Sequence, residues 1–205
     1  MDIREAILNS AEARIRAGGY HACSFREIAS DVGVKSASVH YYFPTKAELG
    51  AALVARYQAR VLAEIGSPDD ERELAAKLNT MRSAFRSGLA RGDGMCLCGV
   101  LATEMRSLPS PVAGATQQYF IACNDWLRRA FARAHTEQPE RKAIQITALL
   151  QGAMLQAIAL EDINAFDAAL EPYPDLQGRI NAKRKPSPRQ QRTPAKRRRE
   201  ETASN

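Results

Sequence analysis

The stretch that decides the fold is residues 24–49, SFREIASDVGVKSASVHYYFPTKAEL, which carries the signals for two short helices joined by a turn. Ser24 and Glu27 have the spacing of a capping box, in which each side chain bonds the backbone N–H of the other residue, so a helix is expected to begin there. It is expected to end near Gly33, which can adopt the positive φ that a sharp turn requires. A second helix is expected over about residues 36–42.

Apolar residues give these two helices surfaces that face each other across the turn. They are Ile28, Ala29 and Val32 on the first helix, and Val34 and Val39 beyond it. This is the arrangement of a helix-turn-helix, whose second helix enters the major groove of DNA. The outward side of that helix keeps polar and cationic residues, which suit phosphates and base edges. An ordinary helix corner with a polar surface is the alternative reading.

The run that follows, Tyr41-Tyr42-Phe43-Pro44-Thr45-Lys46-Ala47-Glu48-Leu49, resembles the DNA-binding domain of TetR-family transcriptional regulators, in the same register after the glycine turn. The resemblance covers about residues 4–55. It implies an all-α fold with an N-terminal three-helix helix-turn-helix domain and a C-terminal helical bundle for ligand binding and dimerisation. The DNA-binding residues it implies are Arg26, Lys35, Ser36, Ser38, His40, Tyr41, Tyr42, Thr45 and Lys46.

Within this set the resemblance implies that Tyr41 and Lys46 contact the phosphate backbone of DNA. It implies that Ser36, Ser38 and His40 face the groove. Packing against the first helix is an equal alternative for Tyr42. Phe43 is expected in the domain core.

Helical spacing continues along the rest of the chain, so we predict an all-α protein. The first helix is expected from Ile3 to Gly18–Gly19. The later helices are expected over about residues 46–65, 68–91, 96–108, 112–135, 139–162 and 164–181. We divide the chain into a DNA-binding domain (1–47), an effector-binding and dimerisation domain (48–182) and a disordered basic tail (183–205).

The positive charge of the chain is concentrated in that tail. The whole sequence has a formal charge of +6, from 29 Lys and Arg against 23 Asp and Glu. Residues 183–205 hold nine basic and two acidic side chains, a net charge of +7. The tail is therefore expected to add salt-sensitive, non-specific affinity for nucleic acid. It also motivates an alternative function, that of a general architectural nucleic-acid-binding protein driven by the tail.

The C-terminal part shows no phosphate-binding loop, no spaced set of metal ligands and no catalytic constellation, so we expect no enzyme activity, metal or cofactor. The four Cys residues do not form a secreted disulfide pattern. No signal peptide and no apolar run of about 20 residues is visible, so a cytoplasmic protein without a membrane span is expected.

Residues 94–105, GMCLCGVLATEM, contain the candidate sensor. They resemble a Gly-x-Cys-Leu-x-Gly segment of a TetR subgroup that includes electrophile-responsive regulators, and Cys96 matches the cysteine of that segment. A thiol at a helix N-terminus has a stabilised thiolate and is more reactive. The alternative is that Cys96 is buried as a small apolar residue.

The helix expected over 139–162 has an apolar surface wider than one helix face requires, which favours a second contact beyond the protomer core. We expect it to form the dimer interface of a four-helix bundle, through Leu149, Leu150, Ala153, Met154 and Ala157. Burial inside one protomer is the alternative. The combined hypothesis is a homodimeric, sequence-specific repressor that binds a double-stranded DNA operator and responds to a small-molecule effector or an electrophile.

Overall fold

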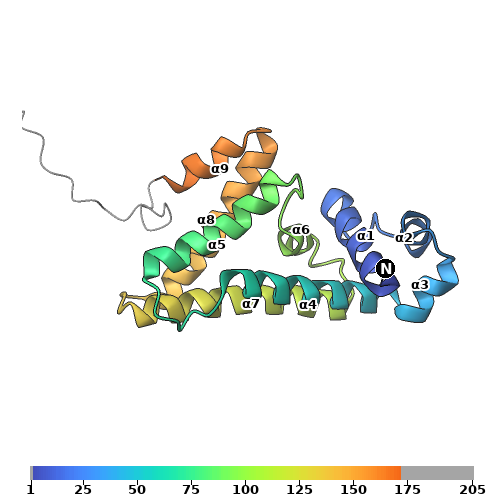
Figure 1. Cartoon of the computed structure of the whole chain (residues 1–205), viewed down its shortest axis with the longest axis horizontal. Helices are drawn as coiled ribbons and strands as arrows, with labels where there is room; N and C mark the ends of the chain where they lie inside the picture. The colour runs from blue at the N-terminus through green and yellow to red at the C-terminus, as the bar shows by residue number, and fades with distance from the viewer. Residues whose placement is uncertain (1, 172–205) are drawn as a thin grey trace, which may run out of the picture.

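The computed structural model describes residues 2–171, and this part of the chain is all-α, with nine helices and no β-strand (Figure 1). The predicted fold class is therefore confirmed. The basic tail and the end of the helix predicted over 164–181 lie outside the described residues. The helices are α1 (Ile3–Gly18), α2 (Phe25–Val32), α3 (Ser36–Tyr42), α4 (Lys46–Ile65), α5 (Leu74–Ala90), α6 (Leu97–Thr103), α7 (Ser110–Arg133), α8 (Pro139–Ala159) and α9 (Ile163–Leu170).

Helices α1, α2 and α3 form a small head at one end of the molecule, coloured blue in Figure 1. The capping box at the start of α2 is formed as predicted, with both Ser24 and Glu27 in their reciprocal bonds. Gly33 ends α2 in the left-handed region, at φ 74°. Ile28 and Val39 are fully buried between α1, α2 and α3, so local sequence signals and core burial specify the same turn.

The remaining helices form a larger body, in which the long helices α4 and α7 lie side by side (Figure 1). Helix α8 packs against α7, α5 and α9, and the short α6 lies between the head and the body. Because α4 starts in contact with α1 and continues into the body, it links the two parts mechanically.

Helix α5 begins at Leu74, not at the Ser67-Pro68-Asp69-Asp70 segment, so that predicted helix start is wrong. The Nζ of Lys77, which is 2% exposed, donates to the carbonyl oxygens of Pro68 (2.7 Å) and Asp70 (2.8 Å). These hydrogen bonds use carbonyl groups that a helix beginning at residue 68 would need for itself. Helix α6 also ends early, at Thr103 rather than near residue 108.

The residues of α8 that were predicted to form the dimer interface lie on the side of the helix that packs inside one protomer. Leu150, Ala153, Met154 and Ala157 are at most 5% exposed within one protomer, so their assignment to a contact between protomers is wrong. Leu149 is half-buried and packs against the same core. The spacing of these residues is that of a helix face, but spacing alone does not say which apolar face of α8 meets its own protomer.

Candidate nucleic-acid interface

Helix α3 is held by one buried residue and presents its other side chains outward. Val39 is fully buried, whereas Tyr41 is 82% exposed, the highest exposure among the large apolar and aromatic residues described. Lys35 is the N-cap residue of α3, and Lys35, Ser36 and His40 are all exposed. This face therefore offers a cation, hydroxyl groups and ring nitrogens without any rearrangement, which are the groups that bind phosphates and base edges.

The ring of His40 has a fixed orientation although it is exposed. It packs edge-on against Phe25, with ring centroids 4.6 Å apart, and its Nδ1 lies 3.4 Å from the carbonyl oxygen of Pro44. The tautomer that donates from Nδ1 to this carbonyl leaves Nε2 as a hydrogen-bond acceptor. His40 is therefore suited to accept a hydrogen bond from a donor on a base edge.

The other residues implied by the resemblance divide into exposed and structural ones. Arg26 is exposed on α2, and Ser38 is half-buried on α3. Tyr42 is half-buried and packs against the hydrophobic core, as one of its two predicted roles required. The hydroxyl of Thr45 accepts a hydrogen bond from the backbone N–H of Glu48 (3.1 Å), so it caps α4.

Lys46 lies at the N-terminus of α4, where backbone N–H groups already favour an anion. Its Nζ is 4.3 Å from the centroid of the Tyr20 ring, a cation–π contact that restricts the side chain without neutralising it. Phe43, between α3 and α4, is 4% exposed, as predicted. The start of α4 thus combines an anion-binding helix terminus with a positioned cation.

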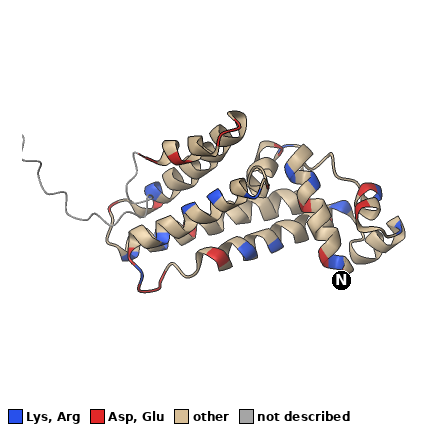
Figure 2. Cartoon of the chain, turned by 45° about the horizontal axis from the view of Figure 1, so that its top comes forward, with Lys and Arg blue, Asp and Glu red and all other residues tan. Residues whose placement is uncertain are grey.

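Elsewhere in the head, charges are paired with one another. Arg14 on α1 donates to both carboxylate oxygens of Asp31 (2.7 and 2.9 Å), and Ser10 donates to the same carboxylate. The hydrogen bonds from Arg14 and Ser10 lower the pKa of Asp31 to about 2. Figure 2 shows basic and acidic residues interspersed over the head and the body. Among the described residues of the head, the exposed groups around α3 are therefore the candidates for contacts to DNA.

The junction of head and body contains a charged cluster that the sequence analysis did not identify. Glu12 on α1 is 8% exposed and accepts hydrogen bonds from Arg56 (2.9 Å) and Arg60 (3.2 and 2.5 Å) of α4. Arg16 forms an ion pair with the same carboxylate at 3.1 Å. One signal was available in the sequence, because Glu12 falls within the apolar face of α1.

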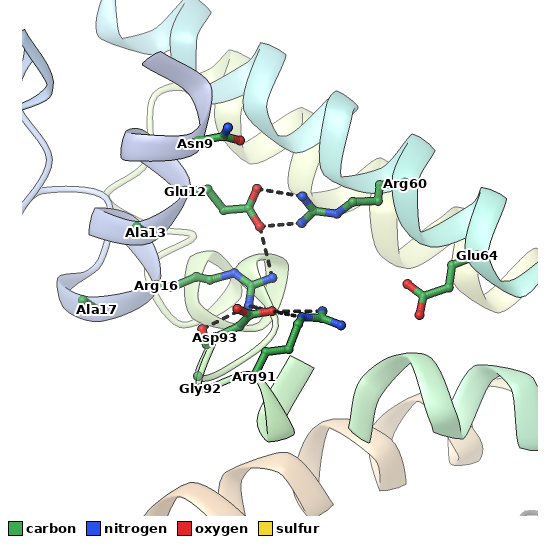
Figure 3. Close-up of a pocket in the computed structure, with 11 residues that line it drawn as sticks. Asn9, Glu12, Ala13, Arg16, Ala17, Arg60, Glu64, Arg91, Gly92 and Asp93 are labelled. Carbon is green, nitrogen blue, oxygen red and sulfur yellow. Dashed lines mark hydrogen bonds and ion pairs between the residues drawn. The ribbon is translucent and has the colours of Figure 1, made fainter. Parts of the chain in front are cut away.

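Beside this cluster a cleft of about 660 Å³ opens between α1, α4 and the loop at residues 91–94 (Figure 3). Arg16 crosses the junction: it donates to the carbonyl oxygen of Asp93 (3.0 Å), and its guanidinium carbon lies 5.3 Å from the ring centroid of Tyr57. A residue of the DNA-binding head therefore contacts both the α5–α6 loop and the interior of the body.

Cys96 lies deeper, at the N-cap of α6, and is 2% exposed. The hydroxyl of Tyr57 donates to its sulfur (3.4 Å), and the thiol in turn donates to the hydroxyl of Tyr119 (3.5 Å). Two further thiols are buried close by. Burial raises the pKa of Cys98 well above its ordinary value and that of Cys123 to about 12. The sulfur of Cys96 is thus enclosed by two tyrosine hydroxyl groups and has little contact with solvent.

Among residues 2–171, no three His, Cys, Asp or Glu side chains come together as a metal site would require. In the same residues no helix has the length and hydropathy that a membrane span needs.

This geometry is that of a helix-turn-helix protein with an exposed recognition helix. Residues 7–53 match the family described as "Bacterial regulatory proteins, tetR family". The chain shows no match among curated proteins. Residues 7–53 are thus a TetR-family helix-turn-helix domain.

Solved structures extend the similarity over most of the chain. A TetR-family transcriptional regulator from Agrobacterium tumefaciens is 28% identical, with a TM-score of 0.79, over 84% of this chain and 96% of the other. A TetR regulator from Legionella pneumophila is 27% identical, with a TM-score of 0.78, over 83% and 95%. The reduced form of E. coli NemR, 21% identical with a TM-score of 0.69 over 83% and 95%, shares the fold. The chain is a DNA-binding transcriptional regulator.

Proposed function

We propose that the chain is a homodimeric repressor whose binding to a specific DNA operator is released by an effector. The observation that carries the proposal is the outward face of α3: Lys35, Ser36, His40 and Tyr41 are exposed while Val39 anchors the helix in the core. A single recognition helix reads few base pairs. Two copies reading half-sites about 34–36 Å apart gain the specificity that an operator needs.

The surface that we propose for dimerisation is the outer stripe of α8. Its members follow a four-three spacing along one side of the helix, the spacing of a helix–helix seam. They are Ile144, Ala148, Gln151, Leu155 and Ile158, of which Ile144, Leu155 and Ile158 are 40–60% exposed. Exposed large apolar residues in a contiguous stripe mark an interaction surface. Ile121 on the neighbouring α7 is 49% exposed and widens the apolar surface available to a second copy.

Variants of α3 and α4 separate phosphate contacts from base contacts. Lys46→Ala is expected to weaken binding to all DNA sequences alike and to reduce the slope of log affinity against log salt by about 1. His40→Ala is expected to cost about 1–3 kcal/mol on the preferred sequence and to relax the preference at one base pair per half-site. Fluorescence anisotropy with the DNA upstream of the chain's own coding region, and with single-base variants of it, measures both effects. Equal losses on all sequences for His40→Ala would contradict its proposed role.

A non-covalent effector fits the surroundings of Cys96 better than an electrophile does. All four cysteines are buried, and burial raises the pKa of Cys23 to about 11. We therefore expect the native protein to react with a thiol-specific disulfide reagent at least about 10-fold more slowly than the unfolded chain, because burial restricts the access of the reagent to all four thiols. Rapid labelling of Cys96 that disappears in Cys96→Ser, together with loss of electrophile-induced DNA release, would instead support the electrophile hypothesis.

Truncation after Ala182 tests the architectural alternative. The repressor proposal predicts that the shortened chain keeps its preference for the upstream DNA, while its affinity for all DNA and its salt slope fall, because the basic tail acts without sequence preference. The comparison is made by anisotropy over a range of salt concentrations. Collapse of binding to every DNA would favour the tail-driven function.

A further inference from the structure

We propose that the cleft between α1, α4 and the loop at residues 91–94 is a binding site for a small oxyanion, a carboxylate or phosphate group, with Arg16 as its central contact. The proposal of a binding site is based on the geometry of the cleft alone. Only the effect of the ligand on DNA binding rests on the function proposed above.

The walls of the cleft come from parts of the chain that are far apart in sequence. Figure 3 shows α1 on one side, α4 on another and the loop at 91–94 closing the base. Gly92 and Gly94 have φ of 75° and 73°, and a Cβ at either would meet no atom within 4 Å. The loop therefore lies open beside the cleft, and the volume of about 660 Å³ is enough for a small metabolite.

The cleft offers guanidinium donors that an anion can use. Three guanidinium groups line it, those of Arg16, Arg60 and Arg91, and they pair with two carboxylates, Glu12 and Asp93. A further guanidinium, Arg56, shares Glu12 from outside the cleft. Arg60 and Arg91 are 49% and 60% exposed, so both keep donors free for a ligand. Guanidinium groups bind carboxylate and phosphate oxygens with particularly strong, well-oriented hydrogen bonds.

The remaining carboxylate of the lining, Glu64, stands apart from these arginines in Figure 3. It is exposed and makes no hydrogen bond or ion pair with any of residues 2–171. The lining therefore carries three guanidinium groups and three carboxylates, so an anion would be held by directed guanidinium donors and not by net charge.

Arg16 supplies the independent observation. Its side chain is only 10% exposed, and its Nε is buried without a hydrogen-bond partner. Among the described residues, Arg56 and Arg82 also have an unpartnered buried Nε, but Arg16 lines both this cleft and a narrow inner pocket of about 30 Å³ beside Tyr57 and Cys96. A buried donor without an acceptor is unfavourable. Because this Nε has almost no exposed surface, an oxyanion oxygen would accept its hydrogen bond only after displacing one of the present contacts of Arg16.

Occupancy of this site would reach the DNA-binding head directly. Arg16 belongs to α1, and its hydrogen bond to the carbonyl oxygen of Asp93 holds the head against the α5–α6 loop, whereas its ion pair with Glu12 lies within α1. An oxyanion competes with the Glu12 carboxylate and with the Asp93 carbonyl oxygen for the same guanidinium group, so it favours arrangements in which the contact to the loop is loosened. Such a ligand changes DNA affinity to the extent that it binds the two arrangements of the head differently.

The test uses the full chain with two probes, sodium benzoate and inorganic phosphate, titrated at constant ionic strength maintained with sodium chloride. Thermal unfolding and calorimetry are expected to show saturable binding of at least one probe. Binding of benzoate indicates a carboxylate ligand, and binding of inorganic phosphate indicates a phosphate ligand. Arg16→Lys, which keeps the charge but removes the planar donors, is expected to weaken this binding by about 10-fold or more. Arg141→Lys, on the exposed surface of α8, is the matched control and is expected to bind normally.

Absence of saturable binding of both probes up to about 10 mM would overturn the site, as would equal binding by Arg16→Lys and the unaltered chain. Arg60→Lys provides a second test if Arg16→Lys does not fold. Preference for the upstream DNA without any binding of either probe would contradict this site alone. Probe binding by a chain without sequence preference would support the site and contradict the proposed repressor function.

Discussion

Replacing both Ile144 and Leu155 with glutamate is expected to convert the protein to a monomer and to weaken binding to the upstream DNA by about 100-fold or more. Both side chains lie on the outer stripe of α8, where they are 60% and 55% exposed in one protomer. Two carboxylates per protomer would meet their counterparts across a symmetric contact and would be desolvated there without partners. Because each residue is exposed, the protomer itself should remain folded.

Sedimentation equilibrium and anisotropy measure the two effects on the same samples. Leu160→Glu is the matched control, since Leu160 is 63% exposed near the end of the same helix but lies off the stripe. A dimer that persists in the double variant, with unchanged DNA affinity, would show that another surface joins the protomers.

Replacing Glu12 with alanine is expected to destabilise the protein by about 3 kcal/mol or more, because it removes the counter-charge shared by the largely buried Arg16 and Arg56 and the half-exposed Arg60. Glu12 itself is 8% exposed. Urea denaturation measures the loss. Asp125→Ala is a suitable control, because the pair of Asp125 with Arg128 is about half exposed and should contribute less than about 1 kcal/mol. A Glu12 variant as stable as the control would show that the cluster contributes nothing.

The same residue gives a pH dependence with a defined sign. Burial alone would raise the pKa of Glu12, but the hydrogen bond from Arg60 and the charges of Arg60, Arg16 and Arg56 lower it below its ordinary value. Its contribution to stability is therefore complete above the ordinary glutamate pKa of 4.5 and is lost as pH falls through the lowered folded value. The Glu12→Ala variant should lose less stability on acidification than the unaltered protein, and an equal loss would contradict this assignment.

The sequence predicted the head most accurately because its boundaries are set by local signals. The capping box at Ser24, the positive φ of Gly33 and the stop before Pro44 act within a few residues, and α2 and α3 begin and end where they place them. The start of α5 could not be predicted in this way. There the buried Lys77 donates to the carbonyl oxygens of residues 68 and 70, a contact that the capping and proline signals at residues 67–70 do not indicate.

The body shows the limits of periodicity. Helix α8 is apolar on more than one side, and its sequence does not reveal which side the same protomer covers, so Leu150 and Met154 were assigned to the wrong contact. The cluster at Glu12 was missed because its partners Arg56 and Arg60 lie 44 and 48 residues away in the sequence. Only the folded chain brings these charges together.

The most direct test of the central claim is the affinity of the full chain for the DNA upstream of its own coding region, compared with a scrambled fragment of the same length and composition. At about 150 mM salt, non-specific contacts to the phosphate backbone are weakened, so the difference in affinity between the two fragments reports sequence-specific contacts. A homodimer reading two half-sites predicts a preference of about 1,000-fold or more for the upstream fragment, with protection of two segments about one helical turn apart. Equal affinity for the two fragments would contradict sequence-specific regulation through α3.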